Sequence, residues 1–347
     1  MKYELLGNSG LRVSELCLGT MTFGSDWGWG AAREECKKMF DAFVKENGNF
    51  IDTANHYTNG TSEKLVGEFI AGERAHFVIG TKYTLNGSPA DPNGGGNHRK
   101  SMVQSLDASL KRLNTDYIDI YWVHAYDGLT PVEEVMRALD DQVRAGKILY
   151  AGISDAPAWL IAQANTIASL RGWSPFIAIQ VQYNLVERTP ERDLLPMARA
   201  LGIGITSWSP LAMGVLTGKY NRNDGAPRRF SKSDAMAAVY VNERNLAIAK
   251  GVADIASEAG RTPSHVAINW IRQKNAYGVP LPIIAGRTEA QLKDNMACLD
   301  FTLTPAQMDR LDALSAITLG FPHDFLGSPG VRELIHGKTE PLINPRR

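Results

Sequence analysis

The stretch FIDTANHYTNGTSEKLVGEFI, residues 50–70, begins as a short apolar strand that ends in a carboxylate. Asp52 closes this strand, and Tyr57 follows five residues later. Taken alone, an aspartate after a strand is typical of a turn, and a tyrosine in a loop is typical of packing. A functional interpretation of the pair therefore needs support from the rest of the chain.

Short apolar segments resembling residues 49–54 recur along the chain and alternate with segments of helical periodicity. The helical segments include residues 31–46, 97–113 and 131–147, and the last begins at Pro131 and ends near Gly146, as helices commonly do. Strands that alternate with helices predict a parallel sheet, and eight such strands close a (β/α)8 TIM barrel. The predicted strands are residues 15–20, 49–54, 77–82, 117–125, 147–154, 176–183, 202–210 and 279–286.

Two other architectures suit a chain of 347 residues: two domains, or an open doubly wound sheet. The doubly wound sheet usually carries G-x-G-x-x-G after its first strand, and this pattern is absent. Because no linker or low-complexity tract divides the sequence, we predict a single α/β barrel domain over residues 1–347. Its expected additions are an N-terminal hairpin at residues 1–12, long loops at 85–97 and 221–234 on the C-terminal face, and an irregular tail at 320–347.

The composition is that of an ordinary globular protein, with 44% hydrophobic residues. Lys plus Arg and Asp plus Glu both total 37, without basic or acidic blocks, so nothing favours a nucleic-acid partner. Cys17, Cys36 and Cys298 are far apart and form no C-x-x-C, which argues against a metal site and for a reducing compartment. With neither a signal peptide nor an apolar span in view, we expect a cytoplasmic protein without a membrane partner.

Ionisable side chains stand at the ends of three consecutive predicted strands. These are Asp52, Lys82 and His124. Side chains alternate along a strand, so each shares a face with the residue two positions before it, and that face points into a barrel. In TIM barrels the chemistry lies at the C-terminal ends of the strands. We therefore expect these groups to meet at the barrel mouth, with the loop after Asp52 folding Tyr57 over them.

Three motifs in this region resemble those of the aldo-keto reductase superfamily. DTANHYTNGTSE at 52–63 is similar to the family's D-T-A-x-x-Y-G-x-x-x-S-E, GTKY at 80–83 to its lysine strand, and DYIDIYWVHAYD at 116–127 to its histidine strand. The resemblance extends over roughly residues 3–314. It implies a catalytic tetrad of Asp52, Tyr57, Lys82 and His124, and the one departure within the motif is Thr58, where many members carry glycine.

Reduction of a carbonyl needs a hydride at carbon and a proton at oxygen. A free tyrosine, with a pKa of about 10, is a weak acid for this at neutral pH, and an adjacent ammonium lowers that pKa. We therefore expect Tyr57 to be the general acid, Lys82 to lower its pKa, and Asp52 to supply the counter-charge of the lysine. His124 is expected to hydrogen-bond and orient the substrate oxygen.

None of these four residues can carry a hydride, so a nicotinamide cofactor is required. The resemblance implies that NADP(H) lies along the later strand ends, with NAD(H) left open. Arg287 favours the former, because a guanidinium pairs well with the additional phosphate. Asp155 departs from the family's usual asparagine and, when ionised, can only accept hydrogen bonds. The implied contacts are Ser154, Asp155 and Gln180 to the carboxamide, Trp208 to the ring, Ser209, Leu211, Gly214, Leu216 and Lys219 to the pyrophosphate, and Gly286, Arg287, Gln291 and Asn295 to the adenosine phosphate.

Trp27 and Trp29, flanked by glycines in the first loop, predict an aromatic wall for a bulky apolar carbonyl compound or alcohol. Two rival functions remain: a regulatory NADPH-binding subunit resembling potassium-channel β-subunits, and a barrel aldolase or isomerase in which Lys82 forms a Schiff base. The tail from residue 320 is expected either to close over the mouth or to mediate oligomer contacts. The sequence leaves the oligomeric state open.

Overall fold

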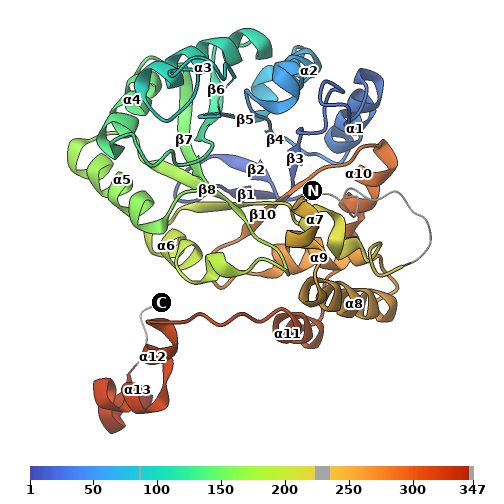
Figure 1. Ribbon diagram of the computed structural model, residues 1–347, viewed down its shortest axis with the longest axis vertical. Helices are drawn as coiled ribbons and strands as arrows, with labels where there is room; N and C mark the ends of the chain where they lie inside the picture. Colours follow the sequence, from blue (N-terminus) through green and yellow to red (C-terminus); the bar gives the residue numbers. More distant parts are fainter. Residues whose placement is uncertain (86, 223–234, 344–347) are drawn as a thin grey trace.

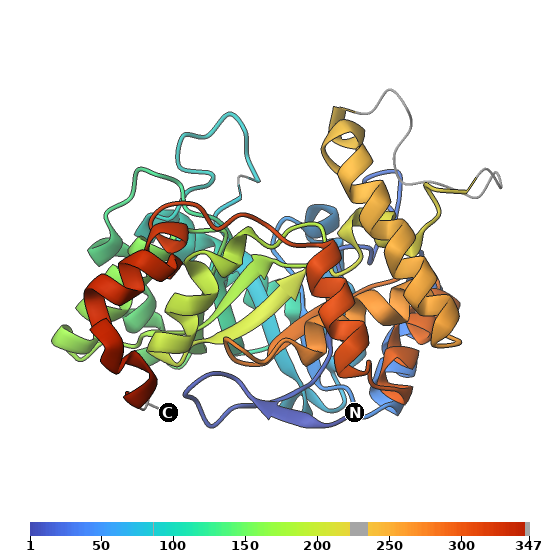
Figure 2. The ribbon, with the colours of Figure 1, turned by 90° about the horizontal axis from the view of Figure 1, so that it is seen from below.

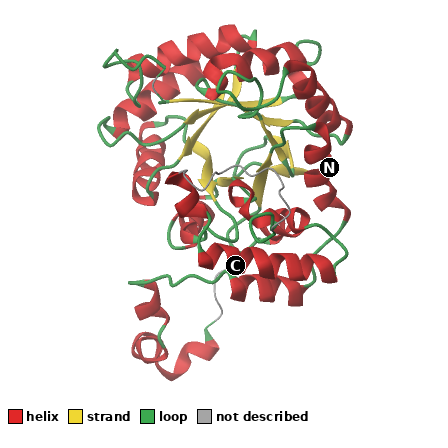
Figure 3. Cartoon of the chain, turned by 45° about the vertical axis from the view of Figure 1, so that its right-hand side comes forward, coloured by secondary structure: helices red, strands yellow, loops and turns green. Residues whose placement is uncertain are grey.

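The computed structural model describes residues 1–85, 87–222 and 235–343. Parallel strands close into a barrel in the order β10-β3-β4-β5-β6-β7-β8-β9, and helices surround it (Figures 1 and 3). The predicted TIM barrel and all eight of its strands are confirmed. The strands are β3 (Cys17–Gly19), β4 (Phe50–Asp52), β5 (Val78–Tyr83), β6 (Ile118–Val123), β7 (Ile148–Ser154), β8 (Phe176–Gln182), β9 (Gly204–Trp208) and β10 (Pro280–Ile284).

The helices outside the barrel include the three predicted ones, which are α1, α3 and α4. Pro131 takes the N-cap position of α4, where its missing N–H leaves no backbone bond unmade. No helix in the described ranges is both long and apolar enough to span a membrane. The helices around the barrel are α1 (Arg33–Lys45), α2 (Thr61–Ile70), α3 (Arg99–Leu113), α4 (Val132–Arg144), α5 (Ala158–Arg171), α6 (Leu194–Leu201), α7 (Ala235–Tyr240), α8 (Glu243–Glu258), α9 (Pro263–Gln273), α10 (Glu289–Met296) and α11 (Pro305–Leu314).

The N-terminal hairpin is confirmed as β1 (Tyr3–Leu5) paired antiparallel with β2 (Arg12–Ser14), two residues longer than predicted. It lies at the end of the barrel opposite the long loops (Figure 2). Leu6 and Val13 pack with the residues inside the barrel, so the hairpin closes the floor. The structure places residues 85–97 in a loop apart from residue 86, whereas most of the expected loop at 221–234 lies outside the described residues.

The prediction of an irregular C-terminal tail is wrong. Residues 323–342 form α12 (His323–Gly327), α13 (Pro329–His336) and the short 3-10 segment η6 (Gly337–Leu342). Two of the prolines that suggested irregular structure stand at the N-cap of α12 and in the first turn of α13, positions that proline tolerates, whereas Pro341 lies inside η6.

The predicted alternation of side chains along the strands is confirmed. Phe50, Val78, Ile120 and Trp122 belong to the cluster inside the barrel, whereas their sequence neighbours pack outward against the helices. Trp122 is fully buried and is the largest side chain in the interior. It fits because Gly80 and Gly152 face it: a Cβ on Gly80 would lie 2.7 Å from the indole Nε1, and one on Gly152 would lie 2.3 Å from Cε3.

We expect Gly152→Ala to destabilise the barrel. The added methyl group would overlap the Trp122 ring, and overpacking of this kind typically costs about 1–3 kcal/mol. Urea unfolding followed by circular dichroism measures the loss. Gly72→Ala is the matched control, because a Cβ there meets nothing within 4 Å. Equal unfolding midpoints for the two variants would contradict this account of the interior.

Candidate active site

A buried ion pair lies at the C-terminal ends of β4 and β5. The ammonium of Lys82 is 2.6 Å from Asp52 Oδ2, and the two side chains are 0% and 4% exposed. The same nitrogen donates to the carbonyl of Thr53 at 2.8 Å and contacts the hydroxyl of Tyr57 at 3.2 Å. All three ammonium hydrogens therefore have an oxygen partner, as a buried charge requires.

The second oxygen of Asp52 is held from across the barrel. Gln180, on β8, donates its amide to Asp52 Oδ1 at 2.9 Å. The sequence pointed to Gln180 only as a cofactor contact, so this link was missed. The bond to the Thr53 carbonyl was missed as well, because a backbone oxygen leaves no signal in the residue types.

The pKa shifts follow from burial and these contacts. Burial alone disfavours the ammonium of Lys82, but Asp52 and Tyr57 together raise its pKa. The expected lowering of the tyrosine pKa is wrong: burial raises the pKa of Tyr57, against the pull of the Lys82 ammonium, and the carboxylate of Asp52 adds to the rise. The phenol of Tyr57 is thus protonated at neutral pH.

His124 follows β6 and packs edge-on against Tyr57, with ring centroids 5.9 Å apart. Burial lowers the pKa of His124 to about 2, and Lys82 and His56 act in the same direction. The imidazole is therefore neutral. Its Nδ1 is buried without a hydrogen-bond partner among the described residues. The structure thus brings together all four residues expected at the mouth.

The turn that carries Tyr57 has an unusual backbone. Thr58 and Asn59 adopt left-handed conformations with φ of 45° and 53°, which are uncommon for residues other than glycine, above all for a β-branched one. The buried Thr58 hydroxyl donates to the Phe23 carbonyl at 2.6 Å and accepts from the Ser62 amide at 3.0 Å. These bonds hold the threonine where the family motif places glycine.

A second buried charge, the carboxylate of Glu63, lies on α2 directly after this turn and was not predicted from the sequence. Glu63, the last residue of the tyrosine motif, accepts from Thr81 Oγ1 at 2.5 Å and from Arg112 Nε at 2.6 Å. Because Thr81 precedes Lys82 on β5, Glu63 ties α2 and α3 to the lysine strand. Its only sequence signal was the conspicuous Ser-Glu that closes the motif.

The first loop lies against the same turn. Trp27 and Trp29 are half-buried, with ring centroids 5.4 Å apart. The indole of Trp27 donates to Asn59 Oδ1 at 3.2 Å, and its ring lies 5.6 Å from that of His56. The guanidinium of Arg287 stands 5.8 Å from the Trp29 ring. The predicted substrate wall therefore touches both the tyrosine turn and one predicted cofactor residue.

The predicted cofactor residues lie at the ends of β7 to β10 and in the segments that follow. Asp155 accepts from Trp208 Nε1 at 3.1 Å, an indole contact that the sequence did not reveal. Burial raises the pKa of Asp155, although Trp208 and Lys82 lower it. Ser154 and Gln180 are register partners on β7 and β8.

The segment after β9 winds into the 3-10 turn η4 (Ala212–Thr217), which includes Leu211 as its N-cap. Ser209, Met213 and Gly214 all have positive φ, and Lys219 lies beside Gly214. The Leu211 carbonyl accepts from the amides of Gly214 and Leu216. The amides of Ala212 and Met213 donate to Ser209 in the same way, so the turn is held by its own hydrogen bonds and the positive charge beside it is the Lys219 ammonium.

After β10, Thr288 caps α10, and the amide of Arg287 donates to Gln291 Oε1 at 2.8 Å. Asn295 binds the Ala285 carbonyl at 2.9 Å, and Thr22 binds that of Gly286 at 2.7 Å. These contacts shape a helix start with an arginine beside it. Within the described ranges no cluster of His, Cys, Asp and Glu is arranged to hold a metal ion.

The low pKa of His124 predicts a specific pH dependence of stability. Between about pH 6.5 and pH 2 the unfolded chain binds a proton on this residue that the folded chain does not, so acidification favours unfolding. Between pH 7 and about pH 4.5 we expect the free energy of unfolding of His124→Gln to fall less than that of the wild type. Urea titrations at the two pH values measure the difference. His76→Gln, at an exposed site, is the control, and an unchanged pH dependence in His124→Gln would refute the assignment.

Comparison with known proteins agrees with this geometry. The sequence model of the aldo/keto reductase family matches residues 15–316. Norsolorinic acid reductase of Aspergillus flavus is 36% identical over 93% of this chain and 83% of its own length. Aryl-alcohol dehydrogenase [NADP(+)] of Phanerodontia chrysosporium is 36% identical over 96% of this chain and 90% of its own. Norsolorinic acid reductase B of Dothistroma septosporum is 36% identical over 93% of this chain and 83% of its own length. The chain is an oxidoreductase that belongs to the aldo-keto reductase family.

Proposed function

We propose that this protein reduces aromatic aldehydes or ketones to alcohols with NADPH, reversibly, and that Tyr57 is the acid–base group. The observation that carries the proposal is the contact of Tyr57 with a fully buried, fully paired Lys82 at the barrel mouth. NADPH, when bound, supplies the hydride. The protein must then deliver a proton to the carbonyl oxygen and orient that oxygen.

The raised pKa of Tyr57 suits the direction of reduction. A protonated phenol is the form that can donate, and the Lys82 ammonium beside it stabilises the phenolate that remains after transfer. Asp52 holds the lysine charged. The neutral imidazole of His124, edge-on to Tyr57, is placed to hydrogen-bond the same substrate oxygen.

The residues after β7 to β10 suit a nicotinamide dinucleotide. Asp155, with its raised pKa, and Ser154 would hold the carboxamide, and Trp208, fixed by Asp155, would face the ring. The left-handed turn at Gly214 with Lys219 beside it suits the pyrophosphate. The cap of α10 and Arg287 suit the adenosine phosphate of NADP rather than the bare ribose of NAD.

The aromatic substrate class rests on the first loop. Trp27 and Trp29 form a tilted pair next to His56, an arrangement against which a planar ring can stack. The names of the relatives, norsolorinic acid reductase and aryl-alcohol dehydrogenase, support the same class. The first loop, residues 20–32, contains no lysine or arginine, so nothing in it favours a phosphorylated substrate.

We expect Tyr57→Phe to lose roughly 10²–10⁴-fold in kcat for carbonyl reduction, because the proton donor is gone while the ring remains. Loss of NADPH absorbance with a panel of aromatic aldehydes and ketones measures the rate. Quenching of tryptophan fluorescence by NADPH shows whether cofactor binding survives. Tyr150→Phe is the control, because this residue lies near the N-terminal end of β7, away from the barrel mouth. Near-normal turnover by Tyr57→Phe would overturn the assignment, and tight NADPH binding by an inactive wild type would point to a regulatory subunit.

The cofactor preference has a separate test. Arg287→Leu should weaken NADPH binding roughly 10–100-fold, the usual worth of a charge-assisted contact, and leave NADH binding unchanged. Fluorescence titration with each cofactor gives the two dissociation constants. Lys293→Ala, an exposed cation on α10, is the control. Equal losses for both cofactors would show that Arg287 does not read the additional phosphate.

A further inference from the structure

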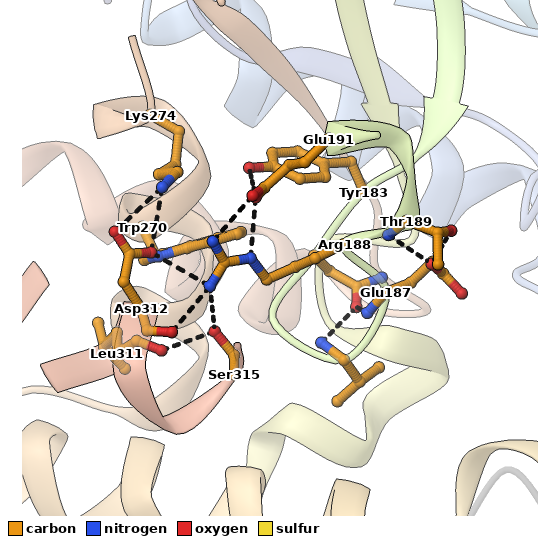
Figure 4. A network of polar contacts seen from close by, with 12 residues as sticks. Tyr183, Glu187, Arg188, Thr189, Glu191, Trp270, Lys274, Leu311, Asp312 and Ser315 are labelled. Carbon is orange, nitrogen blue, oxygen red and sulfur yellow. Dashed lines mark hydrogen bonds and ion pairs between the residues drawn. The ribbon is translucent and has the colours of Figure 1, made fainter. Parts of the chain in front are cut away.

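The C-terminal arm, residues 319–343, is attached to the barrel by a rigid root. Arg188, which is 7% exposed, donates to the Asp312 carbonyl and to Ser315 Oγ, both at 2.9 Å, while Glu191 pairs with the rest of its guanidinium (Figure 4). Arg192 adds a bond to the Thr318 carbonyl at 2.8 Å. The point at which the arm leaves α11 is therefore fixed.

Beyond this root the arm has no core. None of residues 319–343 is buried, and within the described part of the chain no hydrogen bond or ion pair joins them to the barrel. The arm is nevertheless ordered within itself, because Arg332 pairs with Glu340 and the rings of Phe321 and Phe325 lie 6.2 Å apart. Helices this short are marginal in water unless they pack on something.

The surface of the arm is strongly apolar. Its large hydrophobic side chains are 49–86% exposed: Phe321, Phe325, Leu326, Leu334, Ile335, Leu342 and Ile343. Complete burial would remove on the order of 700 Å² per arm, which exceeds the patches that monomeric proteins usually leave exposed. Such a patch marks an interaction surface.

The position of the arm excludes the first of its two expected roles, which was to close over the barrel mouth; the second was to mediate oligomer contacts. Figure 1 shows α12 and α13 outside the ring of helices, and in Figure 2 the helices of the arm lie along the side of the barrel, below the long loops of the mouth. The arm therefore does not cover the active site of its own chain. An intermolecular contact remains.

The chemistry of the arm favours a second copy of the same chain. Its charged residues almost balance, so it lacks the basic face that draws a helix to an anionic membrane. The whole chain has zero net charge, so electrostatic repulsion between copies does not oppose self-association. Two arms related by a twofold axis would bury about 1,400 Å², within the range of about 1,200–2,000 Å² for specific interfaces.

We propose that the C-terminal arm is a dimerisation element, and that each arm of a twofold dimer packs its apolar face against the other chain. The root held by Arg188 fixes the direction in which the arm reaches its partner. This inference concerns assembly and stands independently of the chemistry of Tyr57.

Sedimentation velocity of the full chain at micromolar concentration tests the proposal. We expect a mass of twice 38.0 kDa for the wild type. Removal of residues 321–347, and separately the double substitution Leu334→Asp with Ile335→Asp, should give monomers. The double substitution should leave the circular dichroism unchanged, and the truncation should lower the helical signal only by the share of the removed helices. Leu170→Asp on α5, at a site 81% exposed, is the matched control and should stay dimeric.

Two outcomes would overturn the proposal: a monomeric wild type, and a dimer that persists without residues 321–347. If the monomeric wild type sediments with vesicles of phosphatidylcholine and phosphatidylserine, the arm is assigned to a lipid surface instead. Two variants are used because the substitutions keep the arm in place whereas the truncation removes it, so a shared loss of the dimer identifies the apolar face.

Discussion

The buried pair of Lys82 and Asp52 is the contact on which the rest of the site depends. Removing two charges from water is costly, and the cost is offset only when every donor and acceptor finds a partner. Here the ammonium reaches Asp52, the Thr53 carbonyl and Tyr57, and the second carboxylate oxygen reaches Gln180. These demands fix β4, β5, β8 and the tyrosine turn relative to one another. The ion pair thus acts as a geometric constraint as much as an electrostatic one.

The same burial sets the protonation states. A lysine next to a phenol lowers the pKa of the phenol in water, but removal from water disfavours the phenolate more strongly here. The phenol of Tyr57 is therefore held protonated, and the Lys82 ammonium lies where it would stabilise the phenolate if the proton were lost. The residue types alone predicted Asp52 and Tyr57 as the partners of Lys82, but they predicted the direction of the Tyr57 pKa shift wrongly, because the extent of burial is a property of the closed barrel.

The features that could be predicted are those carried by local pattern. Alternation along Ile120 and Trp122 placed His124 on the inner face, and the eight apolar segments predicted the barrel. What could not be predicted depends on distant backbone: the Gln180 bond spans 128 residues, and the left-handed Thr58 is stabilised by a carbonyl 35 residues away. The tail was predicted wrongly because Pro and Gly were taken to break helices, whereas Pro322, Pro329 and Gly337 there stand at helix starts and ends.

The first loop links the two ends of the candidate site. At one end, the Thr22 hydroxyl donates to the Gly286 carbonyl and the Trp29 ring lies against Arg287. At the other end, the Phe23 carbonyl accepts a hydrogen bond from the Thr58 hydroxyl. The loop is fixed between these contacts, because Phe23 and Ala31 are also buried in the core. The predicted aromatic wall is therefore held by Arg287 on one side and by Asn59 of the tyrosine turn on the other.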